Sequence, residues 1–540
     1  MRPRDRERIQ VEVVSRIVEE HTRRASTAPE GYLETLVNDT LYYERQRLEK
    51  EHDRRKVRDD VTFYDGALRR MSHASERDLR QLVEEMARRF VAEVVGNFNE
   101  RVYRFSTSVI PPGLWALLNA MSPKRLLSPE GIRHGLASHL VVQGEVDHAR
   151  SLLDRGTLVV VPTHSSNLDS ILLGYATYLI GMPPLTYGAG LNLFTNPLIS
   201  FFMKNLGAYK VDRKKQCRLY KDVLKQYATC SLEMGYNNLF FPGGTRSRSG
   251  EVERKLKKGL LGTTITAYVN NLLAGKARPN LYIVPCTLSY MLVLEGETLI
   301  DDHLKEVGKS RYIIEDDEFS RPRKIIKFLS NLMSLDAKIL ITYSKPLDIF
   351  GNQVDIEGRS VDTHGRPVET RRYVTRDDVP YHDPQRDAEY TRETAQAIVQ
   401  SFLGDNVILS THLVAYAVFH LLRRHNPGVD LYRLLRTGGE VASFAMQEVH
   451  REVDLVLETL RAGDGDGRQP RFDRLLEGSD TQAIVAEALR AFSLYHSRPA
   501  AVRRGDRVFH EDRNLLLYYG NRLRGYDLGR RLELVRGGAR

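Results

Sequence analysis

Between residues 138 and 350, short apolar segments alternate with helical patterns, and this alternation constrains the fold more than any other feature. The segments expected as strands are HLVVQGEV, TLVVVPTH, LGAYKVDR, NNLFFPGG, LYIVPCTLSY and KILITYSKPLDIF. Helices are expected over residues 146–156, 168–180, 218–234 and 252–273. Strands that alternate with helices are typical of α/β domains with parallel sheets. We therefore predict an α/β fold, with a central mostly parallel sheet flanked by helices.

Helical patterns also occupy both ends of the chain, whose 540 residues exceed the usual size of one compact domain. Residues 1–134 are rich in charged side chains and are expected to be helical. Residues 351–385 are polar and rich in turn formers, which is typical of a linker or hairpin. Residues 386–540 contain helical segments separated by Gly, Pro and Asp clusters. We predict helical N-terminal and C-terminal regions on either side of an α/β domain at 135–350.

The composition favours an anionic partner, because 80 Lys and Arg against 70 Asp and Glu give a net charge of +10. This balance cannot by itself choose between nucleic acid, a membrane surface and a phosphorylated substrate. The three cysteines, Cys217, Cys230 and Cys286, lack the spacing of metal ligands. They indicate a reduced, cytoplasmic protein without disulfides.

Two apolar segments could be mistaken for membrane spans. Residues 170–182 and 407–422 both fall short of the roughly 20 apolar residues that a spanning helix needs. The first residues mix both charge signs and lack the apolar stretch of a signal peptide. We therefore expect both segments to be buried helices, and any membrane contact to be peripheral, on the cytoplasmic face.

The strand TLVVV leads into His164, which is followed five positions later by Asp169. In α/β sheets, ligand sites form at the carboxyl ends of strands, where His164 is expected. A carboxylate that accepts from one imidazole nitrogen leaves the other nitrogen able to take a proton. The pair is thus a candidate catalytic base, although a helix cap or a core hydrogen bond would explain the same residues.

A second element follows another expected strand, where residues 239–250 read LFFPGGTRSRSG. Glycines let backbone N–H groups approach an anion, and the forked donors of Arg246 and Arg248 match phosphate oxygens. The turn is neither a Walker A loop nor a GxGxxG loop, because the residues that define those loops are missing. The residues alone leave open both a phosphate site and an exposed basic turn.

A third element, residues 204–215, reads KNLGAYKVDRKK and contains another expected strand. Its Lys210 and Arg213 are expected to meet the second element around one anion, since neighbouring parallel strands end at the same edge of a sheet. For Lys214, Lys215 and the basic residues of 254–258, we expect a solvated surface run. The basic residues lack an interleaved aromatic platform, which argues against a nucleic-acid partner.

In this order, the motifs resemble the four sequence blocks of the glycerolipid acyltransferase family, which comprises glycerol-3-phosphate and 1-acylglycerol-3-phosphate acyltransferases. The blocks are matched by His164 to Asp169, GAYKVDR at 207–213, FPGGTRS at 241–247 and IVP at 283–285. Three further stretches are similar to the glycerol-3-phosphate acyltransferase branch: RSRSG at 246–250, the segment 189–211, and LLYY at 516–519.

The resemblance implies transfer of a fatty acyl group from acyl-ACP or acyl-CoA to the sn-1 hydroxyl of glycerol 3-phosphate, giving lysophosphatidic acid. His164 would act as the base and Asp169 would orient it, with no metal or organic cofactor. The implied substrate-binding residues are Lys210, Arg213, Gly243, Gly244, Thr245, Arg246, Ser247, Arg248 and Pro285. An anionic membrane surface is the further partner expected. Two alternatives remain: acylation of 1-acylglycerol 3-phosphate or another lysophospholipid, and a catalytically inactive lipid-binding protein with the same fold.

One residue departs from the family pattern, because Gly243 stands where the third block normally carries glutamate. Glu251 or Glu253 could compensate for the missing acid. From the sequence alone, a glutamate introduced at position 243 is expected to leave the protein folded and to improve discrimination for glycerol 3-phosphate over phosphate monoesters that lack the second hydroxyl. The alternative is a diverged turn that is adapted to glycine, in which the glutamate would collide or bury an unpaired charge.

Overall fold

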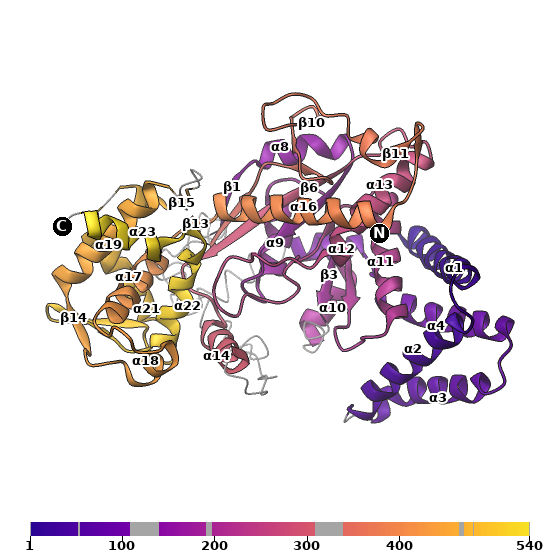
Figure 1. Cartoon of the computed structure of the whole chain (residues 1–540), viewed down its shortest axis with the longest axis horizontal. Coiled ribbons are helices and arrows are strands. Elements are labelled where there is room, and N and C mark those ends of the chain that lie inside the picture. The colour runs from indigo at the N-terminus through magenta and orange to yellow at the C-terminus, as the bar shows by residue number, and fades with distance from the viewer. Residues whose placement is uncertain are drawn as a thin grey trace.

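The computed structural model describes residues 2–51, 54–107, 140–190, 197–307, 339–463, 469–478 and 480–538. A large sheet lies in the middle of the molecule, with the N-terminal helices at one end and the C-terminal helices at the other (Figure 1). This arrangement confirms the predicted fold class, an α/β core with helical regions on both sides. The expected boundary at residues 134–135 lies outside the described residues.

In the described residues, ten strands form one mixed sheet. The strands are β1 (Leu140–Gly144), β2 (Thr157–Pro162), β3 (Thr186–Gly190), β4 (Ala208–Val211), β5 (Asn238–Leu239), β6 (Leu281–Tyr290), β7 (Ile339–Tyr343), β8 (Leu347–Asp348), β9 (Gln353–Val354) and β10 (Ser360–Val361). From β6 the sheet continues through β2, β5 and β3 to β4, and every pair along this path is parallel. On the other side, β7 and β8 pair antiparallel with β6, and β1 runs parallel to β7.

Strands β2 and β6 form the centre of the sheet because both are apolar along most of their length. All six residues of β2 and all ten of β6 are buried. Such continuous apolar runs are typical of parallel strands that are covered on both faces. Because β2, β5 and β4 run in one direction, the loops that follow them open at the same edge of the sheet.

Helices cover both faces of this sheet. They are α8 (Val146–Ser151), α9 (Asp169–Leu179), α10 (Pro197–Asn205), α11 (Arg218–Glu233), α12 (Lys258–Leu261), α13 (Thr263–Leu273) and α14 (Gly296–Val307). Leu173 of α9 shares a core with Val160 on one face, and Ile265 of α13 shares another core with Val159 on the opposite face. Alternate residues of β2 therefore pack against different helices.

Two details of the α/β domain differ from expectation. Strand β3, with the sequence TYGAG, was not expected, because two glycines weaken its strand pattern. The helix expected from residue 252 begins instead at Lys258, since residues 251–257 are irregular and run beside the turn after β5. The backbone N–H of Lys257 donates to Pro242 O at 2.7 Å and holds the two segments together.

The N-terminal helices are α1 (Pro3–Thr27), α2 (Tyr32–Glu49), α3 (Arg54–Met71) and α4 (Glu76–Val94). Helix α4 shows why this charged sequence is helical: Ser75 and Asp78 form a capping box, and apolar residues recur at helical spacing. Among them, Met86 and Phe90 are buried. These residues share one apolar core with Val223 of α11, so the N-terminal helices pack directly on the α/β domain.

Residues 351–385 contain short paired strands, including β11 (Thr375–Arg376) and β12 (Val379–Pro380), and lead into α16 (Pro384–Gly404). Helix α16 runs along the molecule toward the C-terminal region (Figure 1). The helices of that region are α17 (Ser410–Arg424), α18 (Leu431–Thr437), α19 (Met446–Arg461), α20 (Arg474–Glu477), α21 (Thr481–Phe492), α22 (Arg513–Gly520) and α23 (Leu528–Gly538). Short strands lie between them: β13 (Val407–Ile408), β14 (Ser443–Ala445), β15 (Arg471–Phe472), β16 (Ala501–Arg504) and β17 (Arg507–His510).

The two apolar segments form α9 and α17, and both helices contribute buried residues to the same core. Across the described residues, none of the helices combines the length and the apolar character needed to cross a bilayer. In that same part of the chain, no group of three or more His, Cys, Asp and Glu side chains could hold a metal ion. The three cysteines are buried and unpaired.

Candidate active site

Three loops meet at the carboxyl edge of the sheet. They follow β2, β5 and β4, and they carry His164, Arg246 and Arg213 respectively. The positive charges of Arg246 and Arg213 are close enough to His164 to lower the pKa of its imidazole. The charge of Arg248 in turn lowers the pKa of Arg213. The structure therefore brings together candidates from three motifs that are far apart along the chain.

His164 and Asp169 form a tightly anchored pair. Oδ2 of Asp169 accepts from Nδ1 of His164 at 2.8 Å and from the backbone N–H groups of Ser165 at 2.7 Å and Ser166 at 2.9 Å. Its other carboxylate oxygen accepts from the phenol of Tyr290, the last residue of β6. Because an ionised carboxylate only accepts, Nδ1 carries the proton and Nε2 is left as the basic nitrogen.

Burial lowers the pKa of His164, Asp169 acts in the opposite direction, and the positive charges of Arg246 and Arg213 lower the pKa further. The ring also stacks on Phe241, with the two ring centroids 4.0 Å apart. The imidazole is therefore neutral at pH 7, as a general base must be.

Glu295 supports the turn between His164 and α9, although sequence reasoning missed it. This residue follows β6 and is fully buried. Its carboxylate accepts from Ser166 Oγ at 2.8 Å and from the backbone N–H of Asn167 at 2.9 Å. It also lies 3.4 Å from a guanidinium nitrogen of Arg246. The available signal was an acid inside the apolar run MLVLEG, where a charge must be buried and paired if the run is buried.

The turn after β5 is tied to the main chain of His164. The backbone N–H of Ser247 donates to His164 O at 2.7 Å, and the N–H of Gly244 closes the turn on Phe241 O at 3.0 Å. Gly244 has φ +76°, a left-handed conformation that favours glycine. These contacts fix the loop that carries Arg246 relative to His164.

The C-terminal helices support the same turn from outside. Nδ2 of Asn521 donates to Ser249 O at 2.8 Å. A Cβ built on Gly250 would lie 2.1 Å from the carbonyl oxygen of Tyr518, so a glycine is needed for α22 to approach this closely. Arg524 donates to Glu251 at 2.5 Å. Helix α22, which carries the LLYY sequence, therefore helps to support the turn that carries Arg246.

Glu253 fills the space beside Gly243. Its Oε1 accepts from the backbone N–H of His164 at 2.7 Å, and a Cβ on Gly243 would lie 3.1 Å from Cγ and 3.3 Å from Oε1 of this glutamate. Burial raises the pKa of Glu253 to about 7. Of the two acids that could compensate for the missing glutamate, Glu253 thus reaches the turn, whereas Glu251 pairs with Arg524. A side chain at position 243 would be crowded by Glu253, which would have to shift by a few tenths of an ångström, so the fit of a glutamate there stays a prediction.

The three arginines differ in their partners. Arg213 is exposed at the surface. The protein around it removes part of its hydration, and this desolvation, together with the charges of Arg246 and Arg248, lowers its pKa. Arg248 donates to Glu306 at 2.7 Å on α14. Arg246 is committed in part to the buried Glu295, which sequence reasoning did not foresee. Arg213 is therefore the most accessible of these cations for an anionic ligand.

The remaining predicted residues have separate positions. Lys210 is half-buried in β4, next to the loop that carries Arg213. Pro285 is buried inside β6 rather than in one of the three loops. Lys215 does not belong to a solvated surface run, since it is buried and paired with carboxylates of the N-terminal helices.

Comparisons with known proteins find acyltransferases that are similar in sequence to this chain. The model of the family described as Acyltransferase matches residues 142–289. Glycerol-3-phosphate acyltransferase from Pseudomonas paraeruginosa is 25% identical over 276 residues, which are 51% of this chain and 29% of the relative. The protein of the same name from Pasteurella multocida is 32% identical over 206 residues, 38% of this chain and 23% of the relative. The chain thus spans less than a third of the length of these relatives.

A solved structure, the 1-acyl-sn-glycerophosphate (LPA) acyltransferase PlsC from Thermotoga maritima, matches with a TM-score of 0.25 and 14% identity, covering 55% of this chain and 92% of that one. The family match covers the strands and loops that carry His164, Asp169, Arg213 and Arg246. Residues 142–289 of this chain are therefore similar to the acyltransferase family.

Proposed function

We propose that this chain transfers a fatty acyl group from acyl-ACP or acyl-CoA to the sn-1 hydroxyl of glycerol 3-phosphate, giving lysophosphatidic acid. The observation that carries the proposal is the buried His164–Asp169 pair beside an arginine-bearing turn. The anchoring of Asp169 by four donors supports an active enzyme over an inactive lipid-binding protein. The name shared by the relatives supports glycerol 3-phosphate as the acceptor.

In the proposed reaction, Nε2 of His164 takes the proton of the acceptor hydroxyl while the hydroxyl oxygen attacks the thioester carbonyl carbon. Asp169 keeps Nδ1 protonated and stabilises the imidazolium that forms. When the C–S bond breaks, the imidazolium returns the proton to the departing thiolate, so a thiol is released and no acyl-enzyme forms. General-base assistance contributes roughly 10²–10⁴ in rate, and positioning of the two substrates supplies much of the rest.

The phosphate of the acceptor is proposed to bind between Arg213 and the turn of residues 243–248. Arg213 forms no ion pair with a carboxylate in the part of the chain that the structure describes, and its forked donors match phosphate oxygens. The mutual repulsion of the three arginines is relieved when a phosphate dianion lies between them. Gly244 N–H already closes the turn, so the ligand would use other donors of this loop.

The proposal is tested with purified protein, labelled acyl-CoA and acyl-ACP, and two acceptors offered in parallel. Transfer to glycerol 3-phosphate should exceed transfer to 1-acylglycerol 3-phosphate, and lysophosphatidic acid should be the product. A preference for the lysophospholipid would reassign the acceptor. Absence of transfer to either acceptor from either donor would reject an acyltransferase of this type.

Replacing Arg213 by alanine should raise the KM for glycerol 3-phosphate by tens to hundreds of fold. Each lost charge-assisted hydrogen bond costs about 1.5–3 kcal/mol, whereas the KM for the acyl thioester should hardly change. Arg246→Ala is a less selective change, because it also leaves the buried Glu295 without its guanidinium partner. Arg246→Lys should recover only part of that loss, since lysine lacks the fork. An increase only in the thioester KM would assign Arg213 to the donor site.

The pH dependence of kcat/KM should have one acid limb that belongs to His164. Since its pKa is lowered from 6.5, the base stays neutral above that pH, and activity falls only as pH drops through the lowered pKa. Glu253 can accept from the His164 N–H in either protonation state, so Glu253→Gln should leave the limb in place. Steady-state rates between pH 5 and 8 check this; an acid limb at pH 7 that disappears in Glu253→Gln would contradict it.

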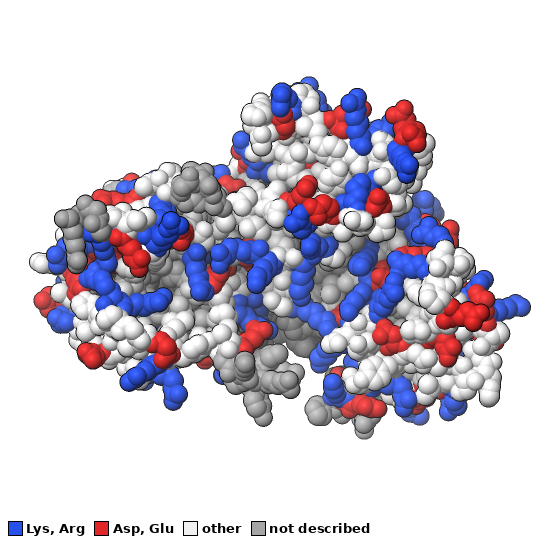
Figure 2. Space-filling view, viewed as in Figure 1, with Lys and Arg blue, Asp and Glu red and all other residues white. Residues whose placement is uncertain are grey.

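We also propose that the protein binds an anionic membrane surface peripherally, on the cytoplasmic face. Its net charge is +10, and Lys and Arg side chains gather across the middle of the face shown in Figure 2. Vesicles with anionic lipid should sediment the protein and release it in high salt, because exposed charges are screened over about 8–10 Å near physiological ionic strength. Equal, salt-resistant binding to neutral vesicles would indicate an apolar anchor instead.

A further inference from the structure

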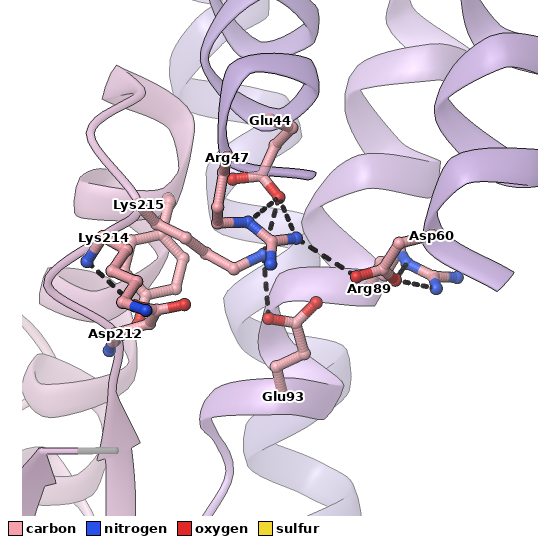
Figure 3. Close-up of polar contacts among 9 residues, drawn as sticks. Glu44, Arg47, Asp60, Arg89, Glu93, Asp212, Lys214 and Lys215 are labelled. Carbon is pink, nitrogen blue, oxygen red and sulfur yellow. Dashed lines mark hydrogen bonds and ion pairs between the residues drawn. The ribbon is translucent and has the colours of Figure 1, made fainter. Parts of the chain in front are cut away.

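Lys215, in the loop after β4, has its ammonium group inside the protein, where only 2% of the side chain is exposed. Its Nζ lies 2.8 Å from Oε2 of Glu44 and 3.0 Å from Oε2 of Glu93, and 4.6 Å from the centroid of the Phe90 ring. Glu44 belongs to α2 and Glu93 to α4. Figure 3 shows the lysine reaching from its loop toward these two helices.

These ion pairs belong to a longer chain of charges that links three N-terminal helices. Glu44 also binds Arg47 at 2.8 Å, and Arg47 binds Asp60 of α3 at 3.1 Å. Asp60 in turn binds Arg89 of α4 (Figure 3). Together with Lys215 and Glu93, the network contains three cations and three anions, so its charges balance. Because a buried charge without its partner is strongly unfavourable, the place of the lysine depends on the packing of these helices.

Arg213 stands on the same turn, two residues before Lys215. The turn has a second anchor at Asp212, whose backbone N–H donates to Tyr220 Oη at 2.8 Å and whose carboxylate accepts from the N–H of Lys214 at 2.9 Å. Asp212 and Lys215 are both buried, whereas the two residues between them are exposed. Arg213 is therefore carried by a short segment that is fixed at both ends.

We infer that Lys215 is a positioning residue of the acceptor site: its ion pairs with Glu44 and Glu93 hold Arg213 in place, so that the N-terminal helices set the affinity for the acceptor phosphate. The inference rests on the proposed function, because it takes Arg213 as a phosphate-binding residue. Lys215 acts through Arg213 and not on the ligand, since carboxylates lie against its ammonium group from two helices.

The test compares Lys215→Met with Lys214→Met, a matched change at the exposed neighbour on the same turn. Lys215→Met should raise the KM for glycerol 3-phosphate by about tenfold or more, with kcat and the KM for acyl-CoA changed by less than about threefold. Lys214→Met should leave all three constants near those of the parent. A merely structural role of Lys215 would lower the melting temperature and the fraction of active enzyme, without a selective change in the acceptor KM.

A double-mutant cycle with Arg213→Ala asks whether the effect passes through the arginine. In the Arg213→Ala background, Lys215→Met should add less than about twofold to the acceptor KM, because the group that it positions is already absent. If the two effects multiply in full, Lys215 does not act through Arg213 and the inference is overturned.

Lys215→Met leaves Glu44 buried with one partner fewer, so a second variant guards against failure to fold. Glu44→Gln with Lys215→Met removes one charge of each sign at similar volume, and should fold with the same selective rise in acceptor KM. An acceptor KM equal to that of the parent would overturn the inference.

Calorimetric binding of glycerol 3-phosphate separates this inference from the proposed function. A parent protein that binds the acceptor but transfers no acyl group would reject the function alone, and weaker binding by Lys215→Met would still support the positioning role. An active parent whose acceptor affinity is unchanged by Lys215→Met would reject the positioning role alone.

Discussion

Alanine in place of His164 should remove nearly all acyl transfer while the protein remains folded and still binds glycerol 3-phosphate. Its Nδ1 is bound to Asp169 at 2.8 Å, which leaves Nε2 as the group proposed to take the proton of the acceptor hydroxyl. Loss of a positioned general base should lower kcat by about 10²–10⁴. Single-turnover rates with a labelled thioester, together with the melting temperature and the acceptor affinity of the variant, measure this effect.

Two companion variants sharpen the experiment. His364→Ala removes an exposed histidine from the turn after β10 and should leave activity at the level of the parent. Asp169→Asn should be nearly as harmful as His164→Ala, because an amide can donate to Nδ1 and favour the wrong tautomer. If His164→Ala retained activity within about tenfold of the parent, another group would have to be the base.

Glutamate in place of Gly243 should reduce activity even though it restores the residue usual in the family. Its Cβ would lie 3.1 Å from Cγ and 3.3 Å from Oε1 of Glu253, so the two carboxylates would compete for one site near Asp169. Like charges at such distances cannot both ionise freely. Displacing Glu253 would also leave the buried N–H of His164 unpaired, at a cost of about 1–3 kcal/mol, which would lower the rate by about five- to 160-fold if it falls on the transition state.

An exchange of the two residues tests this explanation. Glu253→Gly should lose activity alone, whereas Gly243→Glu combined with Glu253→Gly should recover much of it, because one carboxylate again lies beside the His164 N–H. Gly243→Ala is the control, since it adds a methyl group without a charge and should be the mildest change. Kinetics and melting temperatures of the four variants decide the outcome. A double variant no better than Gly243→Glu would show that the two positions do not exchange roles.

The places of His164, Arg246 and Arg213 could be predicted because their signals are local. Each follows a recognisable strand segment, β2, β5 or β4, and parallel strands send the following loops to one edge of the sheet. The His164–Asp169 contact was predictable for a similar reason, since five positions span a single strand-to-helix turn. Helix α4 is equally local, because its cap and its apolar spacing lie within its own sequence.

Other elements depend on partners that are distant in sequence. The strand form of β3, with its two glycines, is stabilised by hydrogen bonds to β4 and β5, which a local pattern cannot show. Residues 252–257 have the pattern of a helix, yet they stay irregular where Glu253 binds the His164 N–H. In both cases tertiary contacts override local preference.

Only the tertiary structure decided which charges are paired. Lys214 and Lys215 are adjacent and identical, yet one is exposed while the other lies between carboxylates of α2 and α4. Glu295 reaches Ser166 across 129 positions of the chain. The type and spacing of residues determine a strand, a helix and the strand-to-helix turn at His164, because those depend on near neighbours. The partner of a charged side chain depends on which remote element packs against it, and an unpaired buried charge is costly enough to make that packing decisive.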